Sequence, residues 1–124
     1  MKVANLSGDE LNYWVAMAIG HEQYYPEDSK NPYRFNWLKC GNNALPTPKY
    51  STDWAQGGPL IDKFKVSISA PSESFEGDNA QWVANIRIGC GGDGKNHFGE
   101  MPLTAAMRAI AARKFGVDVD DILT

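Results

Sequence analysis

The sequence predicts one two-layer α+β domain, in which helices cover one face of an antiparallel sheet. Three observations predict this class: a helical apolar stripe near the N-terminus, two later segments with strict apolar–polar alternation, and another helical stripe near the C-terminus. The chain has 124 residues, 43% of them hydrophobic and 22% charged, which is typical of a single globular domain.

The opening helix is predicted to begin after Ser7. Ser7 and Glu10 form a capping-box pattern, and Leu6 and Leu11 occupy the two positions of a hydrophobic staple. Gly20 is expected to end the helix. The buried face is predicted from residues at helical spacing, namely Leu11, Trp14, Val15 and Ala18.

Residues 21–50 are predicted to form a loop-rich insertion, because prolines, asparagines and a glycine mark repeated turns. Within it, Tyr33–Leu38 alternates aromatic residues with others, which is typical of a short strand at a sheet edge. A two-stranded hairpin alone is marginally stable. We therefore expect this strand, or one from a second subunit of a homo-oligomer, to complete the sheet of the second half.

The stretch Tyr50–Phe64 joins the insertion to that second half. Two hydroxyl residues near its start, Ser51 and Thr52, can cap a helix. The glycine pair that follows would weaken a helix running through it by roughly 1 kcal/mol per residue, and the next proline suits a first helical position. We therefore predict a capped turn over 53–56, a break at the glycines and a short helix over 59–63.

A β-hairpin is predicted next, with its strands joined by an acidic, polar loop over 71–79. Its apolar face carries Phe64, Val66, Ile68 and Ala70 on the first strand and Trp82, Ala84, Ile86 and Ile88 on the second.

The last helix is predicted to start at Pro102 and to end before Gly116. Its expected buried stripe is Leu103, Ala106, Met107, Ile110 and Ala111, with Arg108, Arg113 and Lys114 elsewhere on its surface. The tail 117–124 alternates Val with Asp, and we expect Val119, Ile122 or Leu123 to pack on the body.

Composition and charge exclude several classes of protein. The formal net charge of −3 argues against non-specific DNA binding, which needs clustered cations. No apolar run approaches the roughly 18 residues of a membrane span, and the N-terminus lacks the apolar segment of a signal peptide. We therefore expect a cytoplasmic protein that does not bind a membrane and whose Cys40 and Cys90 are reduced thiols.

The segment Gly89–Asn96 is similar to a phosphate-binding P-loop, with Gly89, Gly94 and Lys95 at the right offsets. However, Asn96 replaces the hydroxyl residue that would hold Mg²⁺. A P-loop also opens directly into a helix, whereas here further residues intervene before Pro102. We therefore interpret this segment as a glycine-rich connection.

The soft metal-ligand candidates are His21, Cys40, Cys90 and His97, none of which has the close spacing of a zinc pair. The same residues could supply a Cys–His nucleophile, but no feature indicates an activating geometry. Buried thiols and surface histidines are the simpler interpretation. Asp118, Asp120 and Asp121 are typical of a solvated acidic run. We expect no metal, cofactor or catalytic residue.

Three segments carry a resemblance to a known family. The string Ser51–Ile61, which reads STDWAQGGPLI, and Pro102–Ala109, which reads PLTAAMRA, resemble the NinX-like proteins of tailed bacteriophages and prophages. Leu11–Gly20 is similar to the opening helix of that family, while the insertion is longer and more aromatic than expected. The family has no established activity, so the resemblance implies a phage accessory role in the cytoplasm of the bacterial host and no catalytic residues.

We expect a non-enzymatic protein that binds a host or phage protein. The alternative is a nucleic-acid-binding module, because a helix–strands–helix layout with a basic last helix has a distant likeness to double-stranded RNA-binding modules, although that helix starts without lysines. Single strands could stack on Tyr24, Tyr25, Tyr33 or Trp37. A third hypothesis is an enzyme, or a protein that binds a small molecule or nucleotide, with a pocket assembled from the insertion and the glycine-rich loop.

The predicted binding site lies in the stretch 53–58, next to the glycine-rich loop that carries Lys95. Asp53 and Gln56 would supply polar groups, and Trp54 would supply a flat apolar ring. Gly57 and Gly58 would let a ligand approach the backbone closely. The competing interpretation makes Trp54 a core anchor and Asp53 a capping or turn residue.

Overall fold

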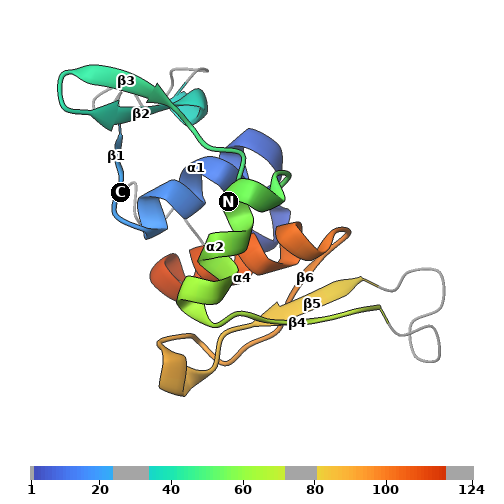
Figure 1. The fold of residues 1–124 in the computed structure, drawn as a ribbon. Coiled ribbons are helices and arrows are strands. Elements are labelled where there is room, and N and C mark those ends of the chain that lie inside the picture. Colours follow the sequence, from blue (N-terminus) through green and yellow to red (C-terminus); the bar gives the residue numbers. More distant parts are fainter. Residues whose placement is uncertain (1, 24–33, 72–80, 117–124) are drawn as a thin grey trace.

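The computed structural model describes residues 2–23, 34–71 and 81–116, and their arrangement confirms the α+β class (Figure 1). The α-helices of this part are α1 (Gly8–Ala18), α2 (Trp54–Phe64) and α4 (Pro102–Phe115). The main sheet consists of β4 (Ser67–Ser69), β5 (Trp82–Asn85) and β6 (His97–Gly99), and single 3-10 turns, η1 (Val3–Asn5) and η4 (Ile88–Cys90), precede α1 and β6. None of the described helices is long and apolar enough to cross a membrane.

Several expectations lie outside the described residues. They concern the loop 71–79 beyond Pro71, the packing of Val119, Ile122 and Leu123, the acidic run Asp118, Asp120 and Asp121, and the stacking residues Tyr24, Tyr25 and Tyr33.

Helix α4 is the central element of the fold. It contacts α1 and α2 as well as all three strands of the main sheet (Figure 1). The predicted bounds and apolar stripe are confirmed, but three further residues, Ala105, Ala109 and Ala112, are also buried. A helix that is apolar nearly all round is typical of the middle of a core. Its five alanines allow close approach from several sides.

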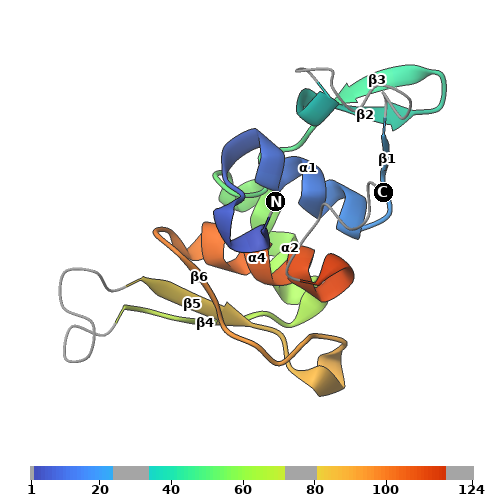
Figure 2. The ribbon, with the colours of Figure 1, turned by 180° about the vertical axis from the view of Figure 1, so that it is seen from behind.

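The three helices begin on one side of the molecule and end on the other (Figures 1 and 2). At the starts, Gly57 of α2 lies against Leu103 of α4. At the ends, the Arg113 guanidinium of α4 lies 4.6 Å from the centre of the Phe64 ring of α2. The rings of Trp14 in α1 and Phe115 in α4 meet edge to face at 5.5 Å.

Helix α1 ends as its sequence predicts. The amide of Gly20 donates to the carbonyl of Met17 at 3.2 Å, and the amide of His21 donates to that of Ala16 at 3.0 Å. These two bonds form a Schellman motif, which requires the left-handed backbone that Gly20 supplies (φ 105°).

The start of α1 differs from the prediction in one detail. Ser7 occupies the N-cap position, but its side chain makes no capping bond to the described backbone. Gly8 follows with a φ of 55°, so the first turn departs from the geometry that a capping box needs. Leu6 and Leu11 are nevertheless fully buried, as the staple pattern predicts.

The prediction of two short helical pieces between residues 53 and 63 is wrong, because α2 is continuous from Trp54 to Phe64. Its cap is Asp53, whose carboxylate accepts a hydrogen bond from the amide of Ala55 at 2.9 Å. Neither Ser51 nor Thr52 occupies the N-cap position.

Packing explains why the glycine pair does not interrupt α2. A Cβ atom at Gly57 would collide with the carbonyl oxygen of Tyr50 and with the side chain of Leu103. The glycine therefore lets α2 approach α4 closely, and the tight packing of the two helices offsets its poor helix propensity. Pro59 lies inside the helix, where it has no N–H to donate to the carbonyl of Ala55.

The main sheet is antiparallel with the order β4-β5-β6, and Ile68 pairs with Ala84, so these two residues share a face as the alternation predicts. Its strands are shorter than expected. Phe64 belongs to α2, and Lys65 ends that helix with a left-handed backbone (φ 55°), so β4 begins only at Ser67. Ala70 is exposed beyond β4, and Ile88 is exposed because the chain turns into η4 after β5.

The third strand of the main sheet is β6, so the expectation that Tyr33–Leu38 or a second subunit supplies it is wrong. The insertion instead forms its own antiparallel sheet of β1 (Glu22–Gln23), β2 (Trp37–Cys40) and β3 (Asn43–Pro46), with β2 in the centre. Residues 34–36 form the 3-10 turn η2 (Arg34–Asn36) rather than strand. The aromatic alternation has another cause here, because the Phe35 ring packs edge to face on Tyr13 at 5.1 Å and anchors the insertion to α1.

Candidate functional site

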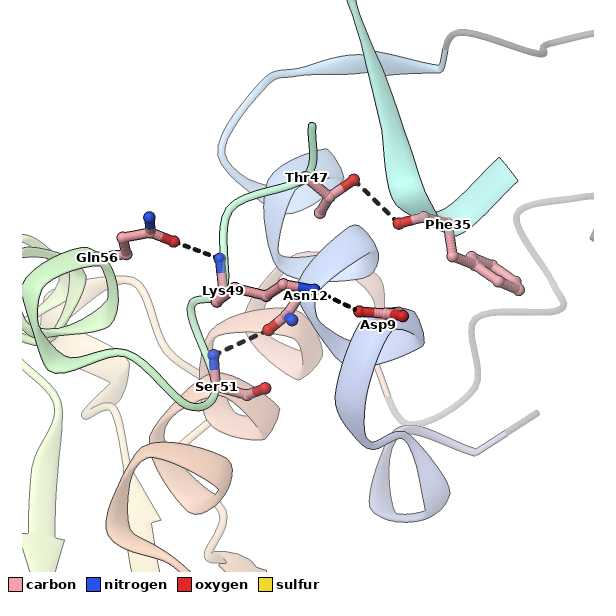
Figure 3. A network of polar contacts seen from close by, with 7 residues as sticks. All are labelled: Asp9, Asn12, Phe35, Thr47, Lys49, Ser51 and Gln56. Atoms are coloured by element: carbon pink, nitrogen blue, oxygen red, sulfur yellow. Dashed lines mark hydrogen bonds and ion pairs between the residues drawn. The ribbon is translucent and has the colours of Figure 1, made fainter. Parts of the chain in front are cut away.

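The segment that leads into α2 is fixed to α1 by polar contacts (Figure 3). The amide of Ser51 donates to the Oδ1 atom of Asn12, which is buried in α1, at 2.8 Å. The backbone amide of Lys49 donates to the side-chain oxygen of Gln56. The ammonium group of Lys49 lies 3.0 Å from the Asp9 carboxylate. These contacts position the start of α2 relative to α1.

Four of the predicted site residues therefore divide into two groups, while Gly58 borders open space. Three of them serve the fold. Asp53 caps α2, Gln56 accepts a hydrogen bond from the Lys49 amide, and Gly57 packs against Tyr50. Trp54 leaves 54% of its surface exposed at the first position of α2, unlike Trp14, which is 3% exposed in the core. A core-anchor role for Trp54 is thereby excluded, and Trp54 presents a flat apolar surface to solvent.

A second large apolar side chain, Met101, is 60% exposed at the start of α4. Beside it lies an open cavity of about 390 Å³, lined by Ala4, Ser7, Gln81, Glu100, Met101, Thr104 and Arg108. The starts of α2 and α4 lie on the same side of the molecule in both views (Figures 1 and 2). We call Trp54, Met101 and this cavity the helix-start face.

Arg108 is a residue that sequence reasoning placed on the helix surface without a role. Its Nε and Nη2 atoms donate to the Leu6 carbonyl at 3.0 and 2.9 Å, and its Nη1 atom donates to the Phe98 carbonyl at 2.7 Å. It thereby joins β6 to the segment before α1. Burial lowers the pKa of Arg108, while the Glu100 carboxylate raises it. Leu6 is 102 positions away in sequence, so no local pattern could reveal this contact.

The glycine-rich segment does not form a phosphate cradle. A P-loop needs free backbone amides, but here five amides already have acceptors. Four of them bond to carbonyls of residues 86–88, just after β5, and the fifth bonds to the Asp93 carboxylate; the donors are Cys90, Gly91, Gly92, Gly94 and Lys95. A strand, β6, follows the segment instead of a helix. The 3-10 turn η4 also lies at the far end of the sheet from the start of α2 (Figures 1 and 2). The structure therefore does not bring Lys95 together with Trp54.

The cysteine and histidine candidates are dispersed. Cys40 and Cys90 are both exposed, so the expectation of buried thiols is wrong. The expectation of a surface histidine is wrong for His97, whose side chain is 10% exposed and whose Nε2 atom lies 3.0 Å from the Asp93 carboxylate. Within 2–23, 34–71 and 81–116, no group of three or more His, Cys, Asp or Glu residues is arranged to hold a metal ion.

Comparison with known proteins identifies one family. Residues 2–114 match the family model described as "Bacteriophage P22, NinX". The match extends over the insertion as well as over the segments that carry the sequence resemblance. No curated protein gives a significant match to the chain.

Proposed function

Since the chain belongs to the bacteriophage P22 NinX family, we propose that it is a phage accessory protein that binds a host or phage protein in the bacterial cytoplasm. The helix-start face is the binding surface in this proposal. The observation that carries it is the exposure of Trp54, a residue of the type most enriched at the energetic centres of protein interfaces.

The energy available at Trp54 is sufficient to matter for binding. A tryptophan buries roughly 150–250 Å² when it is fully covered, so about half of that area remains to be buried by a partner. At about 25 cal/mol per Å², covering it contributes roughly 2–3 kcal/mol. A rigid aromatic ring at the first turn of a helix also loses little conformational entropy on binding.

The surroundings of Met101 fit the same role. Met adapts its shape to different partners, and the neighbouring cavity is wide enough to accept a partner side chain. Ser7, Glu100 and Thr104 line this cavity and supply polar groups of the kind found at interface rims. An apolar centre with polar surroundings is the expected composition of a protein-binding surface.

Nucleic-acid binding receives less support. The order α2–β4–β5–β6–α4 does reproduce a helix–three strands–helix layout. However, the first turn of α4 carries no basic residue, and the donors of Arg108 are directed to backbone carbonyls. If a gel-shift assay at low salt detected salt-dependent binding to an oligonucleotide, this alternative would replace the protein-binding proposal.

The direct test is capture of partners from phage-infected cells with the tagged full-length chain and two variants, Trp54→Ala and Trp37→Ala. Trp37 is the matched control, because it is another exposed tryptophan (36%) but lies in β2 of the insertion. We expect the wild type and Trp37→Ala to recover the same partner, and Trp54→Ala to recover at least about tenfold less. Equal recovery by Trp54→Ala, with its circular dichroism unchanged, would refute the helix-start face as the binding surface.

A further inference from the structure

The C-terminal ends of α1, α2 and α4 meet at an open groove of about 390 Å³, on the opposite side of the molecule from the helix-start face (Figures 1 and 2). We call it the helix-end groove, and it is lined by Met17, Ala18, Ile19, Gly20, Lys63, Phe64, Arg113 and Lys114. All three charged residues of this lining are cationic. We propose that the helix-end groove binds the phosphate group of a small phosphorylated molecule.

The positive charge of these three side chains exceeds the partial negative charge of the helix C-termini. Each helix C-terminus carries a partial charge of roughly −0.5, so three converging ends contribute roughly −1.5. Counted over the described residues of the lining, three full positive charges exceed this negative partial charge. Asp62, the acid next to Lys63, lies 3.6 Å from the Lys65 ammonium instead. In the described part of the chain, neither Lys63 nor Lys114 has an ion-pair partner.

Arg113 supplies the second observation. Its guanidinium stacks on the Phe64 ring at 4.6 Å, and a Cβ atom placed on Gly91 would lie 3.7 Å from its Nε atom. The guanidinium thus stacks on the aromatic ring and lies near Gly91, the residue that follows the η4 turn. Its Nε–H is buried and has no hydrogen-bond acceptor among the described residues. The buried Nε–H is out of reach of a ligand, but Arg113 lines the groove, where the terminal Nη groups of a planar guanidinium can donate charge-assisted hydrogen bonds to a phosphate oxygen.

The size and openness of the groove favour a small ligand. Its volume falls within the range of about 300–1,000 Å³ that is typical of small-molecule sites. Phe64 is buried and covered by Arg113, so the groove offers no free aromatic face for the base stacking that single-strand binders use. The site is also separate from the glycine-rich P-loop-like segment, whose amides are already bonded.

The test uses pyrophosphate as the probe, titrated into the full chain at constant ionic strength and followed by calorimetry and by amide chemical shifts. The test variant is Lys63→Gln with Lys114→Gln. The matched control is Lys2→Gln with Lys95→Gln, which removes the same charge from exposed positions outside the groove. We expect saturable binding with shifts at Gly20, Phe64 and Lys114. We also expect at least about tenfold weaker binding in the test variant and little change in the control.

Three results would overturn the proposal: no saturable binding at millimolar pyrophosphate, equal weakening in test and control variants, or amide shifts that map away from the groove. ATP and a short single-stranded oligonucleotide complete the comparison. ATP binding at least as tightly as pyrophosphate supports a small phosphorylated ligand. Tighter binding of the oligonucleotide, with a steep salt dependence, would overturn that assignment in favour of a nucleic-acid backbone. The outcome is independent of the Trp54 test, because no groove residue belongs to the helix-start face.

Discussion

The two ends of the helical layer use their side chains in opposite ways. At the helix-start face, the polar groups of Asp53 and Arg108 are bonded to the protein itself, and Trp54 remains exposed. At the helix-end groove, the aromatic ring of Phe64 is buried and the ammonium group of Lys114 is left without an ion-pair partner in the described part. Free apolar surface therefore lies at one end and free positive charge at the other, so the two ends suit different ligands.

The most severe way to break this arrangement is to separate α2 from α4 at their starts. Gly57→Ala should destabilise the protein by roughly 3 kcal/mol, because the new Cβ would collide with the Tyr50 carbonyl and with Leu103. Gly58→Ala is the matched control, since a Cβ added there would meet open space apart from its chain neighbours and the backbone of α2 itself. Its gain in helix propensity is partly offset by steric restriction before Pro59, so we expect a change within about 1 kcal/mol. Chemical denaturation measures both; equal losses would contradict the close α2–α4 contact.

Arg108 tests whether the polar groups near the helix-start face are structural. Arg108→Met should cost about 2–3 kcal/mol, because it removes the donors to the carbonyls of Leu6 and Phe98 while keeping an apolar stem. Arg87→Met, at an exposed position, should change the free energy of unfolding by less than about 0.5 kcal/mol. If urea denaturation gave the same midpoint for both variants, Arg108 would be available for binding rather than committed to the fold.

Variants at Asp53 distinguish a capping role of this residue from a role in ligand binding. Asp53→Ala should destabilise the protein by about 1 kcal/mol, because the first turn of α2 loses its hydrogen-bond acceptor. Asp53→Asn keeps a capping oxygen and should retain most of the stability. Thermal denaturation of the two variants distinguishes the roles. A loss of partner capture in Asp53→Asn without any loss of stability would return Asp53 to the binding surface.

The smallest expected effect concerns the pH dependence of stability through Tyr50, and it is absent at neutral pH. Burial raises the pKa of Tyr50 above its usual value of 10.0, so the folded state keeps a proton that the unfolded chain loses. The contribution of Tyr50 to stability is therefore fully present below about pH 10 and is lost as the pH rises through the folded-state pKa. Tyr50→Phe should show a shallower decline of the unfolding free energy above pH 10. An identical pH profile would show that the Tyr50 hydroxyl is solvated.

Elements with local signals were predictable from the sequence. Pro102 and Gly116 delimit α4, and Gly20 ends α1, because proline and glycine impose backbone geometry on their own positions. The strand β6, which precedes α4, was harder to predict from the sequence. β6 spans only three residues, one of them Gly99, and shows no extended alternation, so neither period nor propensity announces it.

The errors at α2 and in the insertion have long-range causes. Gly57 carries the local signal of a helix breaker. The two residues that require a glycine there, Tyr50 and Leu103, are too far apart in the sequence to fall in one local window. Phe35 contributed to an apparent strand pattern, although its ring anchors a 3-10 turn on Tyr13. Tertiary contacts override local propensity in both cases.

The candidate surfaces were predictable only in part. The sequence singled out Trp54 through its polar and glycine-rich neighbours, but its exposure depends on how α2 packs. The cations at the ends of α2 and α4 follow from the sequence, whereas their meeting at one groove depends on how the C-terminal ends of α1, α2 and α4 come together. Met101 and its cavity likewise combine segments from three distant parts of the chain.

The most direct test of the difference between the two ends is a crossed binding measurement. Trp54→Ala and the double variant Lys63→Gln with Lys114→Gln are each assayed for capture of the partner recovered by the wild type and for pyrophosphate affinity. We predict that Trp54→Ala loses the partner but keeps its pyrophosphate affinity, and that the double variant does the reverse. If either variant lost both activities while remaining folded, the two ends would form one functional surface, and their separation would be contradicted.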